Sequence, residues 1–246
     1  MTRRLIKWML IFNLLLLMLA VWRSDALPPP LELHAALLEE PLQTSLQEAP
    51  FDVVSNEVAY TVQPLFDYEL TGLIVSKHNA DSWWDYIHRE ANDSLNITDL
   101  CVIWGNNART GVYADFEFYN LQFTCNFQTN SHQAYAAFDQ AAISNNHLLT
   151  ADPRIAKLMR KVQVGDQIRF RGRLAEYSHN QGFAFKRGTS TVRNDTGNGA
   201  CETVYVDSFE VIKSGNKLWR ALVWVASIML LLSVIAWFMQ PVRYND

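Results

Sequence analysis

The chain has 246 residues, a formal net charge of −4 and 49% hydrophobic residues. An apolar segment of about 20 residues near each end leaves about 195 residues between them, which is enough for one domain with its own core. The net charge by itself indicates no polyanionic partner.

Acidic and basic residues are segregated along the chain. Between Glu32 and Asp99 there are thirteen Asp or Glu residues against two Lys or Arg, and between Arg154 and Arg193 there are ten Lys or Arg residues against two acids. One interpretation is that the two stretches face each other across the fold and cancel. The other is that the basic stretch meets an anionic ligand or partner.

The first predicted membrane segment spans residues 5–23. Its apolar run extends from Trp8 to Trp22 and contains Asn13 as its one strongly polar residue. Cations precede it, and tryptophans stand at both margins, as in a helix anchored at two membrane interfaces. We predict an uncleaved transmembrane anchor. The alternative is a signal peptide, with Ser24-Asp25-Ala26 as a small-x-small cleavage site. Both interpretations export the residues that follow.

Residues 219–239 form the second apolar segment, and Ala221–Met239 contains nineteen residues without a charge. This length and composition predict a transmembrane helix. Lys213, Lys217 and Arg220 lie on its domain side and oppose an outward-facing domain, but the first helix usually dominates orientation. We therefore expect the domain to lie on the outer side of the membrane.

The segment 24–63 contains repeated prolines and is interpreted as an extended linker, with a short helix over 31–40. A domain of residues 64–213 follows. Apolar runs and alternation predict its elements in order. The predicted strands are 68–76, with a bend or bulge at Gly72, 100–104, and 112–127 as one bent strand or a hairpin; helices are predicted over 134–143 and 153–162, and further strands over 167–177, 183–192 and 203–212.

Three strands, a helix and two or three further strands indicate a mainly β domain of the α+β class, and this is the plan of an OB-type barrel with one or two helices. The stretch Gly165–Arg173 resembles the G-D-x-V-x-V-x-G turn and strand found in many OB folds. The flanking transmembrane helices complete the expected architecture.

The span from Tyr60 to Ile212 also resembles an uncharacterised family of bacterial membrane-anchored envelope proteins. The residues that carry the resemblance are Tyr68-Glu69-Leu70, Trp104-Gly105, Ser144-Asn145-Asn146-His147 and the stretch from Asp195 to Glu202. The resemblance implies a bacterial source, and with the expected orientation it implies an inner-membrane protein whose domain is periplasmic. It assigns no chemistry.

Arg169, Arg171 and Arg173 alternate along one predicted strand, so their side chains share a face while Ile168, Phe170 and Leu174 point inward. Three cations in a row need anions nearby. These anions are either acidic side chains of the same chain or a ligand such as a lipid headgroup, an envelope polymer or an acidic protein. Outside the membrane, a nucleic acid is not the expected partner.

Two loops rich in hydroxyl groups and glycine follow, at residues 186–191 and 195–199. Lys186, Arg187 and Arg193 add positive charge to them. Converging backbone N–H groups in such loops bind anions, although ordinary loop chemistry explains them equally well. Neither loop matches a phosphate-binding or dinucleotide-binding motif, so no cofactor is expected.

Cys101, Cys125 and Cys201 allow one disulfide in any of three pairings. No H-x-x-x-H or C-x-x-C spacing is present, so no metal site is expected. Cys201 and the scattered histidines, among them His147, provide a nucleophile and a base, but no spacing joins them.

The function expected from the sequence is that of a membrane-tethered, non-enzymatic binding or scaffold protein. Its partners are membrane lipid and an envelope protein or anionic envelope polymer. An envelope hydrolase or transferase that uses Cys201 or His147 is one alternative, and a nucleic-acid-binding domain facing the cytoplasm is another.

Overall fold

The computed structural model describes residues 3–195 and 201–240. The chain divides into two units: Leu27–Ser214, and a terminal unit made of Met1–Ala26 and Gly215–Asp246. Five positions of the resembling stretch from Asp195 to Glu202, residues 196–200, lie outside the described residues.

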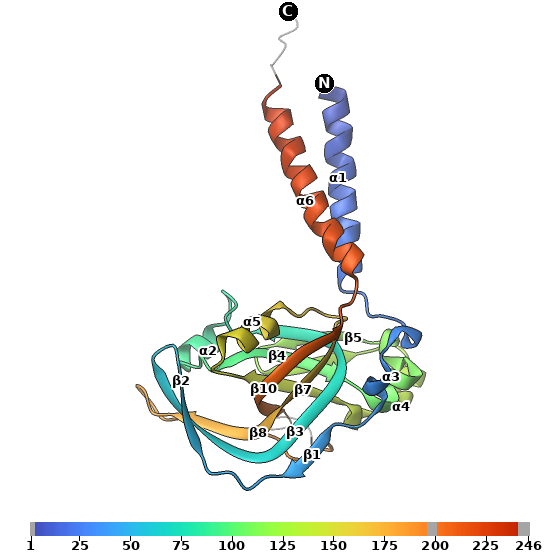
Figure 1. Ribbon diagram of the computed structural model, residues 1–246. Helices are drawn as coiled ribbons and strands as arrows, with labels where there is room; N and C mark the ends of the chain where they lie inside the picture. The colour runs from blue at the N-terminus through green and yellow to red at the C-terminus, as the bar shows by residue number, and fades with distance from the viewer. Residues whose placement is uncertain (1–2, 196–200, 241–246) are drawn as a thin grey trace, which may run out of the picture. The chain divides into compact units, whose positions relative to one another are not determined.

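The terminal unit is a pair of helices, α1 (Arg3–Ser24) and α6 (Lys217–Phe238), which lie side by side in Figure 1. Each has 22 residues and is long and apolar enough to cross a membrane; at 1.5 Å per residue each spans about 33 Å. The two helices are antiparallel, because Arg3 lies over the ring of Trp237 and Arg23 lies over the ring of Trp219.

The contact between α1 and α6 repeats every seven residues. The buried residues are Ile6, Asn13 and Ala20 on α1, and Ala226 and Ser233 on α6. Nδ2 of Asn13 donates a hydrogen bond to Oγ of Ser233 at 2.9 Å. A seven-residue spacing is typical of helices packed along a left-handed seam, and the hydrogen bond gives this polar side chain a partner inside an apolar stretch.

Most of the segment predicted to be a linker, 24–63, belongs to the folded unit. It contains the 3-10 helices η1 (Pro30–Glu32) and η2 (Ala35–Leu38), the strands β1 (Leu42–Ser45) and β2 (Phe51–Ser55), and the start of β3 (Val58–Asn79). Asn56 and Glu57 have φ angles of 46° and 67° and form the two-residue turn of the β2–β3 hairpin. Asn-Glu lacks the glycine that usually marks such a turn, so the hairpin gave no clear sequence signal.

Eight strands form one mixed sheet in the order β1-β3-β4-β7-β10-β8-β9, with β2 on β3 and a further pairing between β3 and β8. The β7–β10 pair is parallel and the other pairs are antiparallel. A mainly β domain with several helices is thereby confirmed. The strands not yet given are β4 (Asn96–Ile103), β7 (Ile143–Leu149), β8 (Gln167–His179), β9 (Phe185–Arg187) and β10 (Glu202–Lys213).

The largest core cluster lies on the inner face of the sheet. Ile168, Phe170 and Leu174 on β8 are fully buried in it, as the alternation along this strand predicts. Helix α5 (Pro153–Lys161) joins β7 to β8 and adds Met159 to the cluster. The bulge expected at Gly72 lies close by, as a register shift between Ile74 and Ser76 where β3 pairs with β4.

A layer of short elements covers β4 and β7. The predicted hairpin within 112–127 is confirmed as β5 (Glu117–Leu121) and β6 (Thr124–Gln128). The helix expected over 134–143 is instead the short α4 (His132–Ala137) and the 3-10 helix η4 (Gln140–Ala142), and the strand expected over 183–192 is reduced to β9. The remaining short elements are α2 (Tyr86–Glu90), α3 (Gly105–Thr110) and η3 (Val112–Asp115).

Strand β7 was not predicted. Its central residues are Asn145, Asn146 and His147. Asparagine is depleted in strands, because its polar side chain rarely suits a buried pleated surface. All three are buried here. Each makes side-chain hydrogen bonds within the domain, which offsets the cost of burial.

Candidate functional site

A cavity of about 1120 Å³ lies over β7 and between the β5–β6 hairpin and the segment 186–195. Asn145 and His147 line its floor, since alternate residues of a strand share a face. Cys101 on β4 forms a disulfide with Cys125 on β6, with a Cα–Cα distance of 5.6 Å. The sequence left three pairings open, and the structure selects this one, which fastens the hairpin to the sheet beside the cavity.

His147 is held between a buried carboxylate and an arginine. Its Nδ1 lies 2.6 Å from Oδ1 of Asp99 on β4, and its Nε2 lies 2.6 Å from Nη2 of Arg187. The guanidinium can only donate, so Nε2 accepts and Nδ1 carries the proton that is donated to Asp99. The site is therefore organised by a neutral imidazole of one tautomer.

The pKa shifts agree with this protonation. Burial is the largest influence on His147 and lowers its pKa, and the nearby Asp99 carboxylate only partly offsets the effect. Burial by itself would raise the pKa of Asp99, but the contacts with His147 and with the Asn96 amide hold that pKa well below its ordinary value. Asp99 is thus ionised and His147 is neutral.

The hydrogen-bond network continues away from the cavity through Asn96. Its Nδ2 donates to Oδ1 of Asp99 at 2.9 Å and lies 3.0 Å from Nε2 of His88. Because this amide nitrogen is a donor, Nε2 of His88 is the acceptor and Nδ1 of His88 carries the proton. A continuous chain of polar contacts therefore joins Arg187 in the cavity to His88 on α2.

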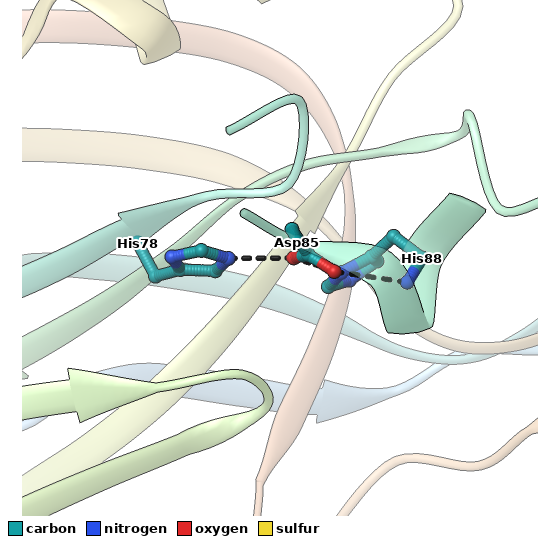
Figure 2. A group of neighbouring side chains, drawn as sticks. All are labelled: His78, Asp85 and His88. Carbon is teal, nitrogen blue, oxygen red and sulfur yellow. Dashed lines mark hydrogen bonds and ion pairs between the residues drawn. The ribbon is translucent and has the colours of Figure 1, made fainter. Parts of the chain in front are cut away.

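His88 belongs to a compact cluster with His78 and Asp85, shown in Figure 2. Oδ2 of Asp85 lies 2.6 Å from Nε2 of His78 and 2.6 Å from Nδ1 of His88. Oδ1 of Asp85 caps α2 by accepting from the backbone N–H of His88, and it also accepts from Gln122. Burial would raise the pKa of Asp85, but the hydrogen bonds from the two histidines lower it overall.

This cluster was not predicted from the sequence. A common metal-binding motif places two histidines one helical turn apart, whereas here His78 lies at the end of β3, Asp85 is the N-cap of α2 and His88 lies in α2. The signal that was present is the spacing D-x-x-H at the start of a helix, which also fits an ordinary N-cap. Among the described residues, these three offer ligand atoms that all lie within 4.8 Å of one another.

The three arginines of β8 lie at a different place and are paired with carboxylates. Arg169 contacts Glu210 at 3.2 Å, Arg171 contacts Glu69 at 2.6 Å, and Arg173 contacts both Glu48 at 2.8 Å and Asp207 at 2.5 Å. Two of these acids, Glu48 and Glu69, come from the acidic stretch of the sequence. The charges in this row are therefore compensated within the domain, which is the first of the two interpretations of the charge pattern.

The other three predicted cations line the cavity. Lys186 forms an exposed ion pair with Glu176 at 2.7 Å. Arg187 lies 4.0 Å from the centre of the Phe123 ring. Arg193 lies over the rings of Tyr68 and Trp104, and its Nη1 is buried without a hydrogen-bond partner. Among the described residues, no carboxylate lies at ion-pair distance from Arg187 or Arg193, whereas Lys186 is paired.

Cys201 also lines the cavity, together with His147. Its Sγ lies 3.6 Å from Nδ2 of Asn145 and 3.6 Å from the carbonyl oxygen of Phe123. Burial raises the pKa of the Cys201 thiol, which keeps it protonated. In the described part of the chain no hydrogen bond joins Cys201 to His147, whose Nε2 is occupied by Arg187.

Comparison with known proteins gives no relative from which a function can be transferred. No model of a known protein family matches the chain, and neither curated proteins nor solved structures yield a similar protein. The class of site therefore rests on its geometry: a half-open cavity with an aromatic wall, two arginines and a buried His–Asp support.

Proposed function

We propose that this chain is a membrane-anchored binding protein whose domain takes an anionic envelope polymer in the cavity over β7. Anchoring is supported by α1 and α6, whose apolar side chains are largely uncovered, as Leu15 at 60% and Trp224 at 74% exposure illustrate. A core helix of a soluble protein buries such side chains, so a lipid environment suits these helices better than water.

The strand pairing supports an OB-type barrel. Strands β3, β4, β7, β10 and β8 pair in a circuit that returns to β3, with β7 and β10 parallel and α5 between β7 and β8. In OB folds the face of the second and third strands and the adjoining loops bind oligosaccharides and oligonucleotides. In this circuit β4 and β7 hold the second and third positions, and the cavity lies on that face.

The observation that carries the proposal is the environment of Arg187. It is partly buried, stacks on Phe123 and donates to neutral His147, and no carboxylate of the described residues lies within ion-pair distance. A guanidinium held in this way is oriented but not neutralised, and it binds carboxylate or phosphate groups strongly. The aromatic wall beside it suits a sugar or other ring of the polymer.

A periplasmic location is supported by the disulfide between Cys101 and Cys125, because disulfides persist in oxidising compartments. Arg3, Arg4 and Lys7 at the start of α1 favour a cytoplasmic amino terminus. Together these features support a domain on the outer side of the membrane, which is the periplasm in the bacterial source that the sequence resemblance implies. A nucleic-acid ligand becomes relevant only if the domain faces the cytoplasm.

Binding is tested with the full-length chain in zwitterionic lipid nanodiscs and fluorescent oligogalacturonate or polyphosphate, with neutral dextran as control. We expect anisotropy to show saturable binding of one of the two anionic probes and none of dextran. Arg187→Gln should weaken this binding about tenfold, the loss of a charge-assisted contact. Arg171→Gln, an exposed and ion-paired control, should leave it unchanged. Equal binding by Arg187→Gln and the wild type would contradict the proposed site.

Orientation is tested separately. Paired reporters fused after Asn216, one active only in the cytoplasm and one only outside, should show activity of the outside reporter alone. Thiol labelling of the protein from the same cells, after denaturation, should modify a single cysteine, Cys201, until a reductant is added. Activity of the cytoplasmic reporter would overturn the periplasmic assignment.

A second candidate function, a thiol hydrolase or transferase, is favoured by one observation: Cys201 and the Asp99-supported His147 line the same cavity. This function requires His147 to exchange Arg187 for the thiol, since a base must reach its nucleophile. The rate of Cys201 alkylation against pH distinguishes the two. A His-activated thiol reacts below neutral pH, whereas an isolated buried thiol reacts only above its raised pKa.

A further inference from the structure

The cluster of His78, Asp85 and His88 brings together two imidazole nitrogens and one carboxylate oxygen. Nε2 of His78 and Nδ1 of His88 each lie 2.6 Å from the same atom, Oδ2 of Asp85, in the cluster drawn in Figure 2. Two histidines and one carboxylate form a ligand set that suits Zn²⁺ and other first-row divalent ions.

The three side chains are held in place by the surrounding structure. His78, Asp85 and His88 are 4%, 0% and 2% exposed. The ring of Trp84 lies 4.5 Å from that of His78, and the ring of Phe123 lies 4.2 Å from that of His88. Asp85 is oriented through its second oxygen by the backbone N–H of His88 and by Gln122. In metal sites, the ligating side chains are characteristically held in place by hydrogen bonds from their other polar atoms.

To hold an ion, the carboxylate oxygen must move away from the two nitrogens, and these nitrogens, which lie within 4.8 Å of each other, must take up tetrahedral spacing. In a tetrahedral site with bonds of about 2.0–2.1 Å the ligand atoms lie about 3.3 Å apart. Oδ2 of Asp85 lies 2.6 Å from each nitrogen, so the carboxylate would withdraw by roughly 0.7 Å to admit the ion. Gln122, whose amide is already within 3.2 Å of Asp85, is a neighbouring polar group for the remaining coordination position, along with water.

The buried amide of Asn96 supplies a second, independent observation. Binding of a cation at Nδ1 of His88 moves the ring proton to Nε2, which then needs an acceptor. Oδ1 of Asn96 is buried and has no hydrogen-bond partner, while its Nδ2 is the atom now beside Nε2 of His88. Rotation of this amide would give the proton its acceptor and Oδ1 its partner. It would also replace the hydrogen bond from Nδ2 to Asp99 with a contact between two oxygens, so the Asp99 carboxylate must shift away from the amide when the ion binds.

The geometry points to a site for one divalent transition-metal ion of the Zn²⁺ class, with Nε2 of His78, Oδ2 of Asp85 and Nδ1 of His88 as its protein ligands. The ion ties the end of β3 to α2. His88 packs on Phe123, and Arg187 lies over the ring of Phe123, so the bound ion also stiffens the wall of the cavity. This inference goes beyond the proposed binding function and does not depend on what the cavity binds.

The test uses the full-length chain in detergent micelles, stripped with EDTA and then titrated with Zn²⁺ or Co²⁺. We expect one Zn²⁺ per chain by elemental analysis, a visible absorption spectrum of four-coordinate Co²⁺, and a Zn²⁺-dependent rise in Tm, because an ion that binds only the native state stabilises it. Mg²⁺ should produce none of these effects. His88→Gln and Asp85→Asn should weaken Zn²⁺ binding at least about tenfold.

His132→Gln is the matched control, since His132 is exposed at the start of α4, and it should bind Zn²⁺ like the wild type. If His88→Gln or Asp85→Asn fails to fold, the measurements on the wild-type chain alone decide. Absence of both the Co²⁺ spectrum and the Zn²⁺-dependent rise in Tm would overturn the proposal and leave the cluster as a hydrogen-bonded support. Undiminished Zn²⁺ affinity in His88→Gln would overturn it equally. Neither result affects the polymer-binding test, which reads Arg187.

Discussion

Nη2 of Arg187 lies 2.6 Å from Nε2 of His147, and this contact connects the cavity to the buried core. The opposite nitrogen of the same ring donates to Asp99, so the carboxylate determines which nitrogen accepts from the arginine. Asp99, which would not touch the ligand, thereby orients Arg187, which we propose binds the ligand.

Asp99→Asn is expected to weaken polymer binding through this contact. The amide no longer selects the His147 tautomer that accepts from Arg187, and a hydrogen bond to a charged group is lost. We expect a fall in stability of about 2 kcal/mol and about fivefold weaker binding, measured by urea denaturation and by anisotropy with the anionic probe. Asp81→Asn, which removes an exposed carboxylate, is the control. Unchanged affinity in a folded Asp99→Asn variant would refute the positioning role.

Reduction of the Cys101–Cys125 disulfide is expected to destabilise the domain. The bridge closes a loop with a sequence separation of 24 residues, for which the chain-entropy model gives about 3 kcal/mol. Cys125→Ser should lower Tm and remove its sensitivity to dithiothreitol. Cys201→Ser should keep both the Tm and the dithiothreitol sensitivity of the wild type. A Tm of the wild type that does not respond to dithiothreitol would argue against the bridge.

Glu202 is expected to make stability fall as pH rises. Burial raises its pKa from 4.5 to about 8, so the folded state favours the neutral carboxyl. Its contribution to stability is complete below pH 4.5 and is lost as pH rises through about 8. Within this window the free energy of unfolding should fall by at most about 1.4 kcal/mol for each unit of pH. Glu202→Gln should flatten this pH dependence in urea denaturation, whereas Glu90→Gln, at an exposed position, should not.

The arginines of β8 are expected to contribute unequally to stability. Arg171 is 67% exposed and contacts one carboxylate, whereas Arg173 is 24% exposed and contacts two. Arg171→Gln should change the free energy of unfolding by less than about 1 kcal/mol, and Arg173→Gln should cost more, because it leaves Glu48 and Asp207 without their shared cation. Urea denaturation of both variants measures the difference. Similar values would show that both pairs act as ordinary surface contacts.

Several parts of the fold were predictable because local sequence determines them. The apolar length of α1 and α6, the alternation of buried and exposed residues along β8, and the amphipathic α5 are properties of consecutive residues. Hydrophobic periodicity reports such properties directly. By contrast β7, with polar residues at its centre, and the β2–β3 turn at Asn56 and Glu57 were missed because their local composition resembles loop sequence.

The candidate site depended on tertiary structure. Asp99 and His147 are 48 residues apart, and Arg187 is 40 residues beyond His147, yet pairing of β4 with β7 places the first two in register. Likewise Glu48 neutralises Arg173 across 125 residues. Sequence by itself determined which segments are apolar, which strand faces alternate and how charge is distributed. Only the fold decided which charges are matched, which cysteines pair and which histidines meet a carboxylate, because these depend on strand register between residues remote in the chain.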